Sequence, residues 1–341
     1  MVIGIVRASP RANAKQRQGP HAGPRRAQKT TTGARRKATH NTGRNPREDP
    51  RARPDDDRDL LVIGIVSPGA MGAGLGGALR HGGARVVTTL DGRSERSGRL
   101  AAAAGLELLG SLDDVVAAAR VVLVVTPPGA ARDAARDIAD AARRTGARPL
   151  VADLNAVAPT TVASIEATLA EAGLDLVDGS ISGPPPGVRP GARVYLSGAR
   201  AGEVAALPWR DVRPILLAGP NGRASAVKMS TASVYKGVTA VVAQALRAAD
   251  FHGVLDEVLA DLGETADPGA IAVAATKAAR FVAEMREISS AQGAAGLTPA
   301  LFEAFAEVYA EIAATDLAAG HPEDTPRDVP AAEVVRRLRR R

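Results

Sequence analysis

Short apolar runs alternate with helical patterns between Leu60 and residue 220, and turn residues separate them. The run Leu60–Val66 is apolar throughout, as expected for a strand buried on both faces of a sheet. Further strands are predicted at Arg85–Leu90, Leu106–Leu109, Val121–Val125, Leu150–Leu154, Asp175–Asp178, Arg193–Ser197 and Val212–Ala218. Helices are predicted between them at Ala73–His81, Ser94–Ala104, Ser111–Ala119, Ala130–Thr145 and Pro159–Ala172, with a loop at Gly179–Pro190. This alternation predicts an α/β fold with a doubly wound parallel sheet.

After residue 220 the pattern becomes helical throughout. A long helix is predicted over Ala224–Phe251, interrupted only by Gly237, and further helices over Val254–Leu262, Ala270–Ser289 and Pro299–Ala314. The chain therefore divides into a disordered basic extension (1–59), an α/β domain (60–220), an all-helical domain (221–316) and a loose basic tail (317–341). The tail contains one short predicted helix, Ala331–Leu338.

The net charge of +7 comes from the ends of the chain. Residues 1–59 carry 15 Lys and Arg against 6 Asp and Glu, which leaves about −2 for the remainder, so nucleic acid is not an expected partner of the fold. Residues 1–59 have few apolar side chains and can be a basic arm that binds nucleic acid, an organellar presequence, or a segment preceding a start near Leu60. We favour the disordered appendage or a misplaced start.

The absence of cysteine excludes disulfides, zinc thiolates and cysteine nucleophiles, and no metal site is predicted. It also suits a reducing compartment, and a cytoplasmic location is expected. No apolar run reaches the roughly 20 residues that a membrane-spanning helix needs, so no membrane association is expected.

A glycine turn joins the first predicted strand to the first predicted helix. Strand, glycine turn and helix in this order are typical of a Rossmann dinucleotide-binding unit, in which the helix start faces a pyrophosphate. The alternative is a plain strand–helix turn, and Ser67 stands where the fingerprint has its first glycine. We favour the cofactor interpretation and predict that the phosphates are bound at Ser67, Pro68, Gly69, Ala70, Met71 and Gly72.

Residues 60–316 resemble the β-hydroxyacid dehydrogenase superfamily, which includes 3-hydroxyisobutyrate and 6-phosphogluconate dehydrogenases and imine reductases. Four stretches match its motifs in the same order along the chain. They are Ala70-Met71-Gly72, Asp153-Leu154-Asn155 through Pro159, Asp178 to Gly183, and Gly222 to Lys228. The last resembles Gly-x-Gly-x-x-x-Lys, with Ala224 in place of the second glycine. The Gly183-Pro184-Pro185-Pro186 loop and the helical stretch Ala226–Ser230 resemble those of a bacterial branch of this superfamily, whose C-terminal domain is described as phosphogluconate-dehydrogenase-like.

The resemblance implies an enzyme that transfers hydride between NAD(P) and the CH–OH group of a small hydroxy acid. It implies that Lys228 is the general acid/base, that Thr126, Pro127 and Asn155 lie by the cofactor, and that Ser182, Gly183 and Pro184 bind substrate. Gly92 aligns with the ribose-binding acid of NAD-dependent members, and Arg93 and Ser94 follow as in NADP-dependent members. NADP is therefore the predicted cofactor, with NAD as the alternative favoured by Asp91. A homodimer built through the helical domains is also implied.

Lys228 lies among Ala226, Val227 and Met229, a setting in which burial can lower the pKa of a lysine toward neutrality. Tyr235 falls about 20° round the helix from Lys228 and is predicted to donate to the substrate or to Lys228, or to be half-buried at a helix interface. Lys236 falls about 80° away and is predicted to lie on another face.

Thr231 and Ala232 replace the family's asparagines, and Thr231 keeps a hydroxyl for the substrate. These replacements and the prolines after Gly183 argue against a plain 3-hydroxy acid as substrate. An imine reductase-like enzyme and a non-catalytic dinucleotide-binding protein remain as alternatives.

Overall fold

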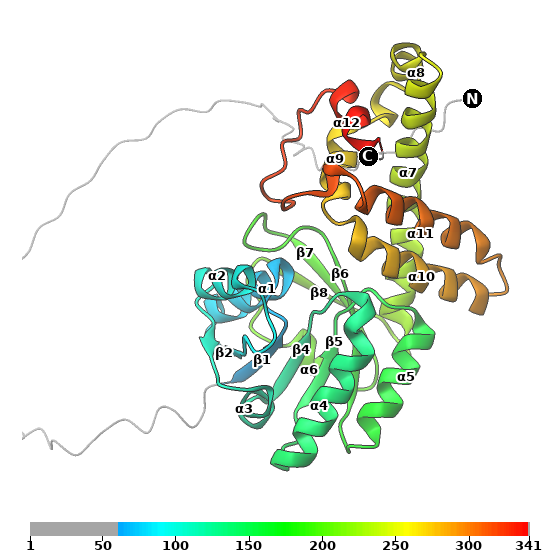
Figure 1. The fold of residues 1–341 in the computed structure, drawn as a ribbon. Helices are drawn as coiled ribbons and strands as arrows, with labels where there is room; N and C mark the ends of the chain where they lie inside the picture. Colours follow the sequence, from blue (N-terminus) through cyan, green and yellow to red (C-terminus); the bar gives the residue numbers. More distant parts are fainter. Residues whose placement is uncertain (1–60, 340–341) are drawn as a thin grey trace, which may run out of the picture. The chain divides into compact units, whose positions relative to one another are not determined.

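The computed structural model describes residues 61–339, which form an eight-stranded sheet followed by a group of helices (Figure 1). The predicted extension at residues 1–59 lies outside the described residues. The strands are β1 (Val62–Val66), β2 (Arg85–Thr88), β3 (Glu107–Leu108), β4 (Val121–Val124), β5 (Leu150–Asp153), β6 (Leu176–Ser182), β7 (Ala192–Ser197) and β8 (Val212–Leu216). The helices between them are α1 (Ala70–His81), α2 (Glu95–Ala103), α3 (Leu112–Ala118), η1 (Pro128–Ala130), α4 (Ala131–Thr145), α5 (Pro159–Ala170) and α6 (Ala201–Ala205).

The strand order is β3-β2-β1-β4-β5-β6-β7-β8, and all neighbours pair in parallel except β6 and β7. The chain reverses its winding direction between β1 and β4, so the predicted doubly wound sheet is confirmed. The prediction of a loop from Gly179 is wrong, because β6 continues to Ser182 and pairs with β7. A short loop without a crossover helix joins these two strands, and such a connection requires antiparallel pairing.

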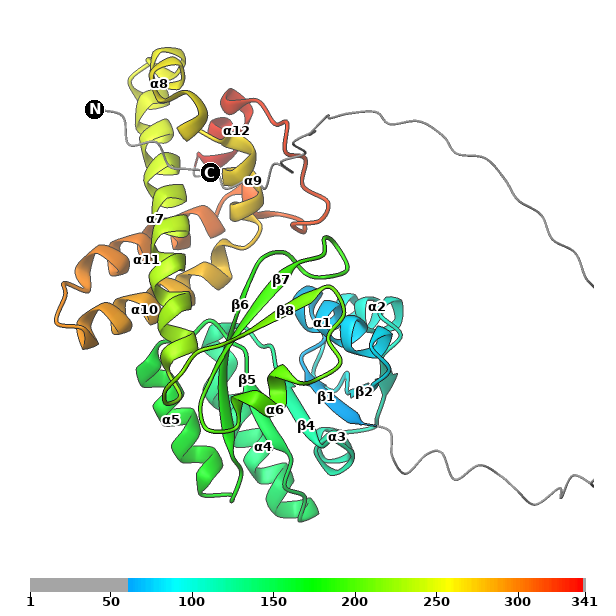
Figure 2. The same ribbon diagram turned by 180° about the vertical axis from the view of Figure 1, so that it is seen from behind.

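Alternate side chains of the strands enter two separate cores. Ile63 and Ile65 of β1 pack with Leu75 and Leu79 of α1, whereas Val66 packs on the opposite face with Ile138 of α4. Figures 1 and 2 show α3, α4 and α5 together on one face of the sheet. Both faces of the central strands are therefore covered, which explains their continuous apolar sequences.

The second half of the described chain consists of α7 (Arg223–Phe251), α8 (Leu255–Leu262), η2 (Gly263–Thr265), α9 (Pro268–Ala275), α10 (Ala278–Ala294), α11 (Ala300–Ala313), η3 (Asp316–Ala318) and α12 (Ala331–Leu338). The single helix predicted at Ala270–Ser289 is wrong, because the helix breaks at Thr276 and Lys277. The Thr276 hydroxyl donates to the carbonyl of Val273 and competes with helix continuation. No helix in the described part of the chain is long and apolar enough to cross a membrane.

The described part of the predicted tail contains η3 and α12. The short helix predicted at Ala331–Leu338 is confirmed as α12. Its Val334, Val335 and Leu338 are fully buried in the core of the helical group, together with Leu317 of η3. The apolar residues lie on one side of α12, and Arg336 and Arg337 lie outside the core, so α12 is an amphipathic helix within a basic segment.

The carboxylate of Asp178 attaches the start of α7 to β6. Its Oδ2 accepts from the N–H groups of Gly222 and Ser225 at 2.9 and 3.1 Å and from the Ser197 hydroxyl at 2.8 Å. Its Oδ1 accepts from the Ser225 hydroxyl at 2.6 Å. Because α7 has no side-chain cap of its own, this buried carboxylate compensates the positive end of the helix and fixes its position.

We expect Asp178→Ala to lower the free energy of unfolding by about 3–5 kcal/mol, because four buried donors lose their acceptor. Asp178→Asn keeps one acceptor oxygen and should cost about 1–2 kcal/mol. Urea denaturation measures both values. Two variants each within about 0.5 kcal/mol of the unchanged protein would contradict this role.

Gly72 allows α1 to start directly above the turn that follows β1. A Cβ at Gly72 would lie 2.3 Å from the backbone oxygen of Ser67, whereas a Cβ at Gly77 on the same helix would lie 3.5 Å from its nearest neighbour, the Cβ of Ala104. Gly72→Ala should therefore destabilise the protein by about 2 kcal/mol or more. Gly77→Ala is the matched control and should stabilise by up to about 1 kcal/mol through helix propensity. Equal melting temperatures for the two variants would contradict the close approach at Gly72.

Candidate cofactor and catalytic site

The predicted site residues lie at one edge of the sheet. The strands β1, β2, β4, β5 and β6 are parallel, so the loops that follow them meet at the carboxyl edge. In doubly wound sheets, ligands bind at this edge where the winding direction changes, here between β1 and β4.

Ser67 has the backbone conformation that the first fingerprint glycine would adopt. Its φ is +72°, in the left-handed region, which costs a residue with a side chain roughly 1–2 kcal/mol. Its carbonyl oxygen accepts from the N–H of Gly69 at 2.8 Å, which closes the turn. The serine therefore preserves the turn geometry at this position.

The start of α1 fits the pyrophosphate of a dinucleotide. The helix has no side-chain cap and no acidic residue in its first turn, so its positive end is uncompensated. A Cβ at Gly69 would meet no atom within 4 Å, which leaves open space beside the first N–H groups. Pro68 is buried, and Met71 packs against the core under the helix. These features are those that backbone recognition of phosphate requires.

Asn155 connects the loops that follow β4 and β5. Its Oδ1 accepts from the N–H of Thr126 at 2.6 Å, and its Nδ2 donates to Asp153 Oδ2 at 3.0 Å. Asn155 is 2% exposed, so its amide positions the Thr126 loop. The Thr126 hydroxyl is buried and has no hydrogen-bond partner within residues 61–339, as expected if a bound cofactor supplies one. Pro127 is exposed on the same loop.

Asp153 is a buried acid beside this loop. Burial raises the pKa of its carboxyl group to about 7, and the charge of Asp178 contributes to the increase, against the hydrogen bonds from Asn155. The carboxyl group therefore changes charge near neutral pH while it supports the asparagine.

The end of β2 presents a cation to the region where the fold binds the adenosine ribose. Gly92 has a φ of +65°, and Arg93 after it is exposed. The backbone N–H of Arg93 donates to the carbonyl of Leu90 at 2.9 Å, and no hydrogen bond or ion pair joins its guanidinium to another described residue. Ser94 caps α2 by accepting from the N–H of Ser97. Arg96, which the sequence reasoning missed, donates to Glu323 at 2.5 and 2.9 Å.

Lys228 lies on the second turn of α7 and reaches back to β6. Its Nζ donates to the carbonyl oxygen of Ile181 at 2.8 Å, directly before the predicted substrate residues Ser182 and Gly183. Burial lowers the pKa of the Lys228 ammonium, and the charge of Arg280 lowers it further, although Glu284 opposes both effects. The structure therefore brings the predicted base and the predicted substrate loop together.

The loop after β6 contacts α1, the helix predicted to face the cofactor. The Ser182 hydroxyl accepts from Arg193 at 3.2 Å. Pro184 to Pro186 are partly buried, and a Cβ at Gly74 of α1 would lie 3.1 Å from Pro186 and 3.2 Å from Pro185. The predicted substrate loop thus lies against α1, next to the phosphate-binding turn.

Three further side chains of α7 lie beyond Lys228. Tyr235 is 73% exposed, so its predicted half-burial at a helix interface is wrong. Thr231 is exposed, and its hydroxyl donates to the backbone carbonyl of Val227. Lys236 forms an ion pair with Glu284 of α10, and its pKa falls to about 8, mainly through burial and partly through the charge of Lys228. A helical wheel describes one helix alone, whereas the burial of the Lys236 side chain depends on its packing against α10.

Helix α10 packs across the same edge of the sheet. Glu287 accepts from the N–H of Ala158 and from the Thr161 hydroxyl, both at 2.7 Å, and so caps the start of α5. A Cβ at Gly129 of η1 would lie 3.7 Å from Ala283. The loops after β4 and β5 are therefore close to α10.

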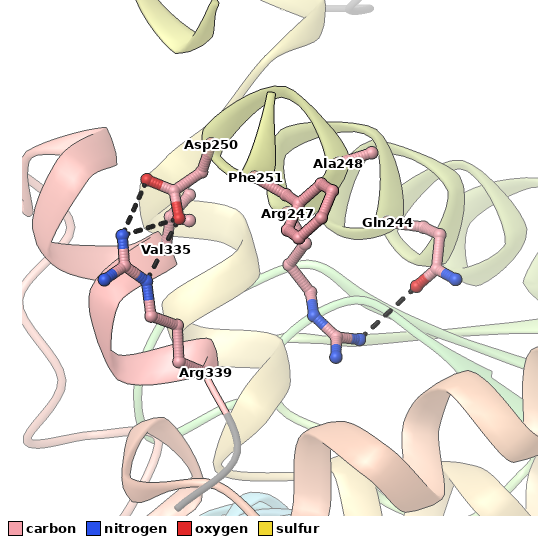
Figure 3. A pocket seen from close by; sticks show the side chains of 7 residues that line it. All are labelled: Gln244, Arg247, Ala248, Asp250, Phe251, Val335 and Arg339. Atoms are coloured by element: carbon pink, nitrogen blue, oxygen red, sulfur yellow. Dashed lines mark hydrogen bonds and ion pairs between the residues drawn. The ribbon is translucent and has the colours of Figure 1, made fainter. Parts of the chain in front are cut away.

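A cavity of about 670 Å³ lies far along α7 from Lys228 (Figure 3). It is lined by Gln244, Arg247, Ala248, Asp250, Phe251, Val335 and Arg339. Figure 3 shows Arg339 paired with Asp250 and Arg247 directed toward Gln244. Gln244 follows Lys228 by about 24 Å along the helix axis, so this cavity is separate from the candidate site.

Comparison with known proteins gives two matches to family models. Residues 62–218 match the NAD binding domain of 6-phosphogluconate dehydrogenase, and residues 249–312 match a domain of unknown function, DUF1932. No curated protein matches the chain.

Solved structures cover nearly the whole fold. The conserved protein MTH1747, of unknown function and described as structurally similar to 3-hydroxyacid dehydrogenases, is 27% identical with a TM-score of 0.55, over 74% of this chain and 96% of its own. A conserved hypothetical protein from Sinorhizobium meliloti 1021 is 25% identical with a TM-score of 0.54, over 82% and 97%. The Mycobacterium tuberculosis 3-hydroxyisobutyrate dehydrogenase with L-serine shares the fold at 22% identity and a TM-score of 0.57, over 82% and 99%.

The glycine turn, the strand order and the match over residues 62–218 lead to the same assignment. Residues 62–218 therefore form an NAD-binding domain of the 6-phosphogluconate dehydrogenase type, and residues 249–312 belong to the domain family DUF1932.

Proposed function

We propose that this protein is an oxidoreductase that transfers hydride between NADP(H) and a small hydroxy acid or related carbonyl compound. Lys228 is the general acid/base in this proposal. The observation that carries it is the position of Lys228, whose Nζ is held 2.8 Å from the Ile181 carbonyl beside Ser182 and Gly183, in surroundings that lower its pKa.

When bound, the nicotinamide supplies or accepts the hydride. The protein's own residues perform the proton transfer and the positioning. Neutral Lys228 takes the proton from a substrate hydroxyl in oxidation, and its ammonium form returns it to a carbonyl oxygen in reduction. The Ile181 carbonyl accepts a hydrogen bond from the Nζ of Lys228 and so orients the other N–H bonds and the lone pair of this amine. Ser182, held by Arg193, is available to bind a substrate carboxylate.

NADP is the proposed cofactor because a cation follows β2 where an NAD enzyme needs an acid. Arg93 is exposed next to Gly92, and its guanidinium suits the planar recognition of a phosphate. The exposed Asp91 is the residue that would favour NAD.

Lys228→Met should keep the fold, since methionine fills a similar volume, and should lower kcat by a factor of about 100 to 10,000. In the unchanged protein the oxidation rate should rise with pH and level off below the ordinary lysine pKa, because a lowered pKa frees the neutral amine at lower pH. Rates measured against pH with saturating cofactor test both expectations.

Lys228→Arg is the matched variant, because arginine keeps the charge but does not release its proton near neutral pH. It should retain substrate and cofactor affinity without restoring kcat. A Lys228→Met enzyme with most of its kcat would contradict the acid/base role, and a raised KM with nearly unchanged kcat would assign Lys228 to substrate binding.

Arg93→Ala should weaken NADPH binding by about 10- to 100-fold and leave NADH binding nearly unchanged, because it removes a charged partner of the 2′-phosphate. Arg99→Ala, an exposed arginine on α2, is the matched control. Fluorescence titration with both cofactors measures the effect. Tighter binding of NADH than of NADPH by the unchanged protein would refute the NADP assignment.

A further inference from the structure

A chain of buried hydrogen bonds runs from the end of β5 to the loop after β4. Asp153, the last residue of β5, accepts from the backbone N–H of Asn155 at 2.9 Å and from its Nδ2 at 3.0 Å. The Oδ1 of Asn155 accepts from the N–H of Thr126 at 2.6 Å. Asp153 and Asn155 are each 2% exposed, so bulk water does not compete for these contacts. The position of the Thr126 loop therefore depends on Asp153 through a single amide.

The carboxylate of Asp153 determines which way round the Asn155 amide lies. An ionised carboxylate only accepts hydrogen bonds, so the Nδ2 of Asn155 faces it and the Oδ1 faces the Thr126 N–H. The reverse orientation would bring oxygen atoms together at Asp153 and N–H donors together at Thr126. Both oxygens of Asp153 accept from Asn155, so protonation of either one replaces a charge-assisted bond by a weaker neutral one.

Asp153 is the less compensated member of a pair of buried carboxylates. It is in register with Asp178 on the neighbouring strand β6. Asp178 has four donors, whereas Asp153 has only the two that Asn155 supplies. Within residues 61–339, no cation forms an ion pair with Asp153, and the charges that act on it, those of Asp178 and of Glu287 on α10, are both negative. A proton taken up by this pair therefore goes to Asp153.

Thr126 connects this chain of hydrogen bonds to the cofactor edge. Its loop follows β4, next to the change of winding between β1 and β4 where a doubly wound NAD-binding domain takes its dinucleotide. The backbone N–H of Thr126 is held by Asn155, and its buried hydroxyl has no partner among the described residues. The Asn155 amide thus fixes the backbone that carries the one polar group of this loop still available to a ligand.

We propose that Asp153 is a positioning residue for the dinucleotide, and that its ionised form holds the Asn155 amide and the Thr126 loop in the arrangement that binds the cofactor. Binding of the dinucleotide then releases a proton from Asp153. The affinity for the dinucleotide accordingly falls as Asp153 becomes protonated. This inference rests on the dinucleotide-binding part of the proposed function and needs no role for Lys228.

Protonation of Asp153 should act in opposite directions on the fold and on cofactor binding. Burial raises the pKa of its carboxyl group from 3.8 to about 7, so the folded chain holds this proton more tightly than the unfolded chain does. The contribution of Asp153 to stability is therefore present at low pH and is lost as the pH rises to about 7. Cofactor affinity should instead increase as the pH passes through this value. A residue with a structural role alone would change both in the same direction.

Fluorescence titration with NADH at about pH 6 and about pH 8 tests the proposal without turnover. NADH lacks the 2′-phosphate of NADPH, a group that itself titrates near pH 6. The Kd of the unchanged protein should be about 3- to 10-fold higher at the lower pH. Asp153→Asn, which is neutral at every pH, should show the higher Kd at both. NADPH should give the same difference between these two proteins.

Asp175→Asn is the matched control and should keep the pH dependence of the unchanged protein. Asp175 precedes β6 at the opposite edge of the sheet, and its exposed carboxylate pairs with Arg200. The melting temperatures of the unchanged protein and of Asp153→Asn, measured over the same pH range, check the opposite effect on the fold. Relative to the variant, the unchanged protein should lose stability as the pH rises.

Asn155→Ala separates the titration of Asp153 from its effect on the cofactor. This variant keeps the carboxyl group and removes the amide, so its melting temperature should still depend on pH whereas its Kd should not. A pH-independent Kd in the unchanged protein would overturn the proposal. So would full pH dependence of the Kd in Asp153→Asn or in Asn155→Ala, and the second variant decides the question if the first does not fold.

The outcome does not depend on catalysis. A protein that binds NADH with the expected pH dependence but reduces no carbonyl acid would contradict the proposed function and leave the role of Asp153 intact. A protein that binds neither NADH nor NADPH at any pH would contradict both.

Discussion

The carboxylate of Asp178 is the contact on which the site depends. It accepts four hydrogen bonds from the start of α7 and from β7, and it lies on β6 three residues before Ile181. Since α7 is held at its first turn, Lys228 on the second turn is placed opposite the Ile181 carbonyl. A shift of α7 along its axis by one residue would move Lys228 about 1.5 Å, enough to break that bond. The position of the proposed base is thus fixed by a buried charge at a helix end.

Much of the cofactor edge could be predicted from the sequence, because its requirements are local. A buried strand, a turn that admits Gly69 and Gly72, and a helix without an acid at its start follow one another along the chain. Ser67 shows the limit of the motif, since the turn needs a left-handed residue and a serine adopts that conformation at a modest cost. Lys228 could be found by its motif because its position depends mainly on the helix in which it lies.

Features that depend on distant packing could not be predicted. A helical wheel of α7 predicts another face for Lys236 but does not show its partner Glu284, which lies 48 residues later on α10. The continuation of β6 to Ser182 depends on pairing with β7, and the burial of α12 depends on a core built from α7 and α9 to α11. The ion pair between Arg96 and Glu323 joins residues that are 227 positions apart. In each case the residue type permitted the contact, but the sequence does not show which partner is near.

The starts of the helices differ in whether a carboxylate compensates their positive end. Where a helix start serves the fold, a carboxylate compensates it, as Asp178 does for α7 and Glu287 does for α5 from 129 residues away. The starts of α1 and α10 have no such carboxylate among the described residues, and α10 carries Lys277 and Arg280 there instead. An uncompensated positive end costs stability unless an anion occupies it. The uncompensated start of α1 therefore suits the negative charge of a dinucleotide's pyrophosphate.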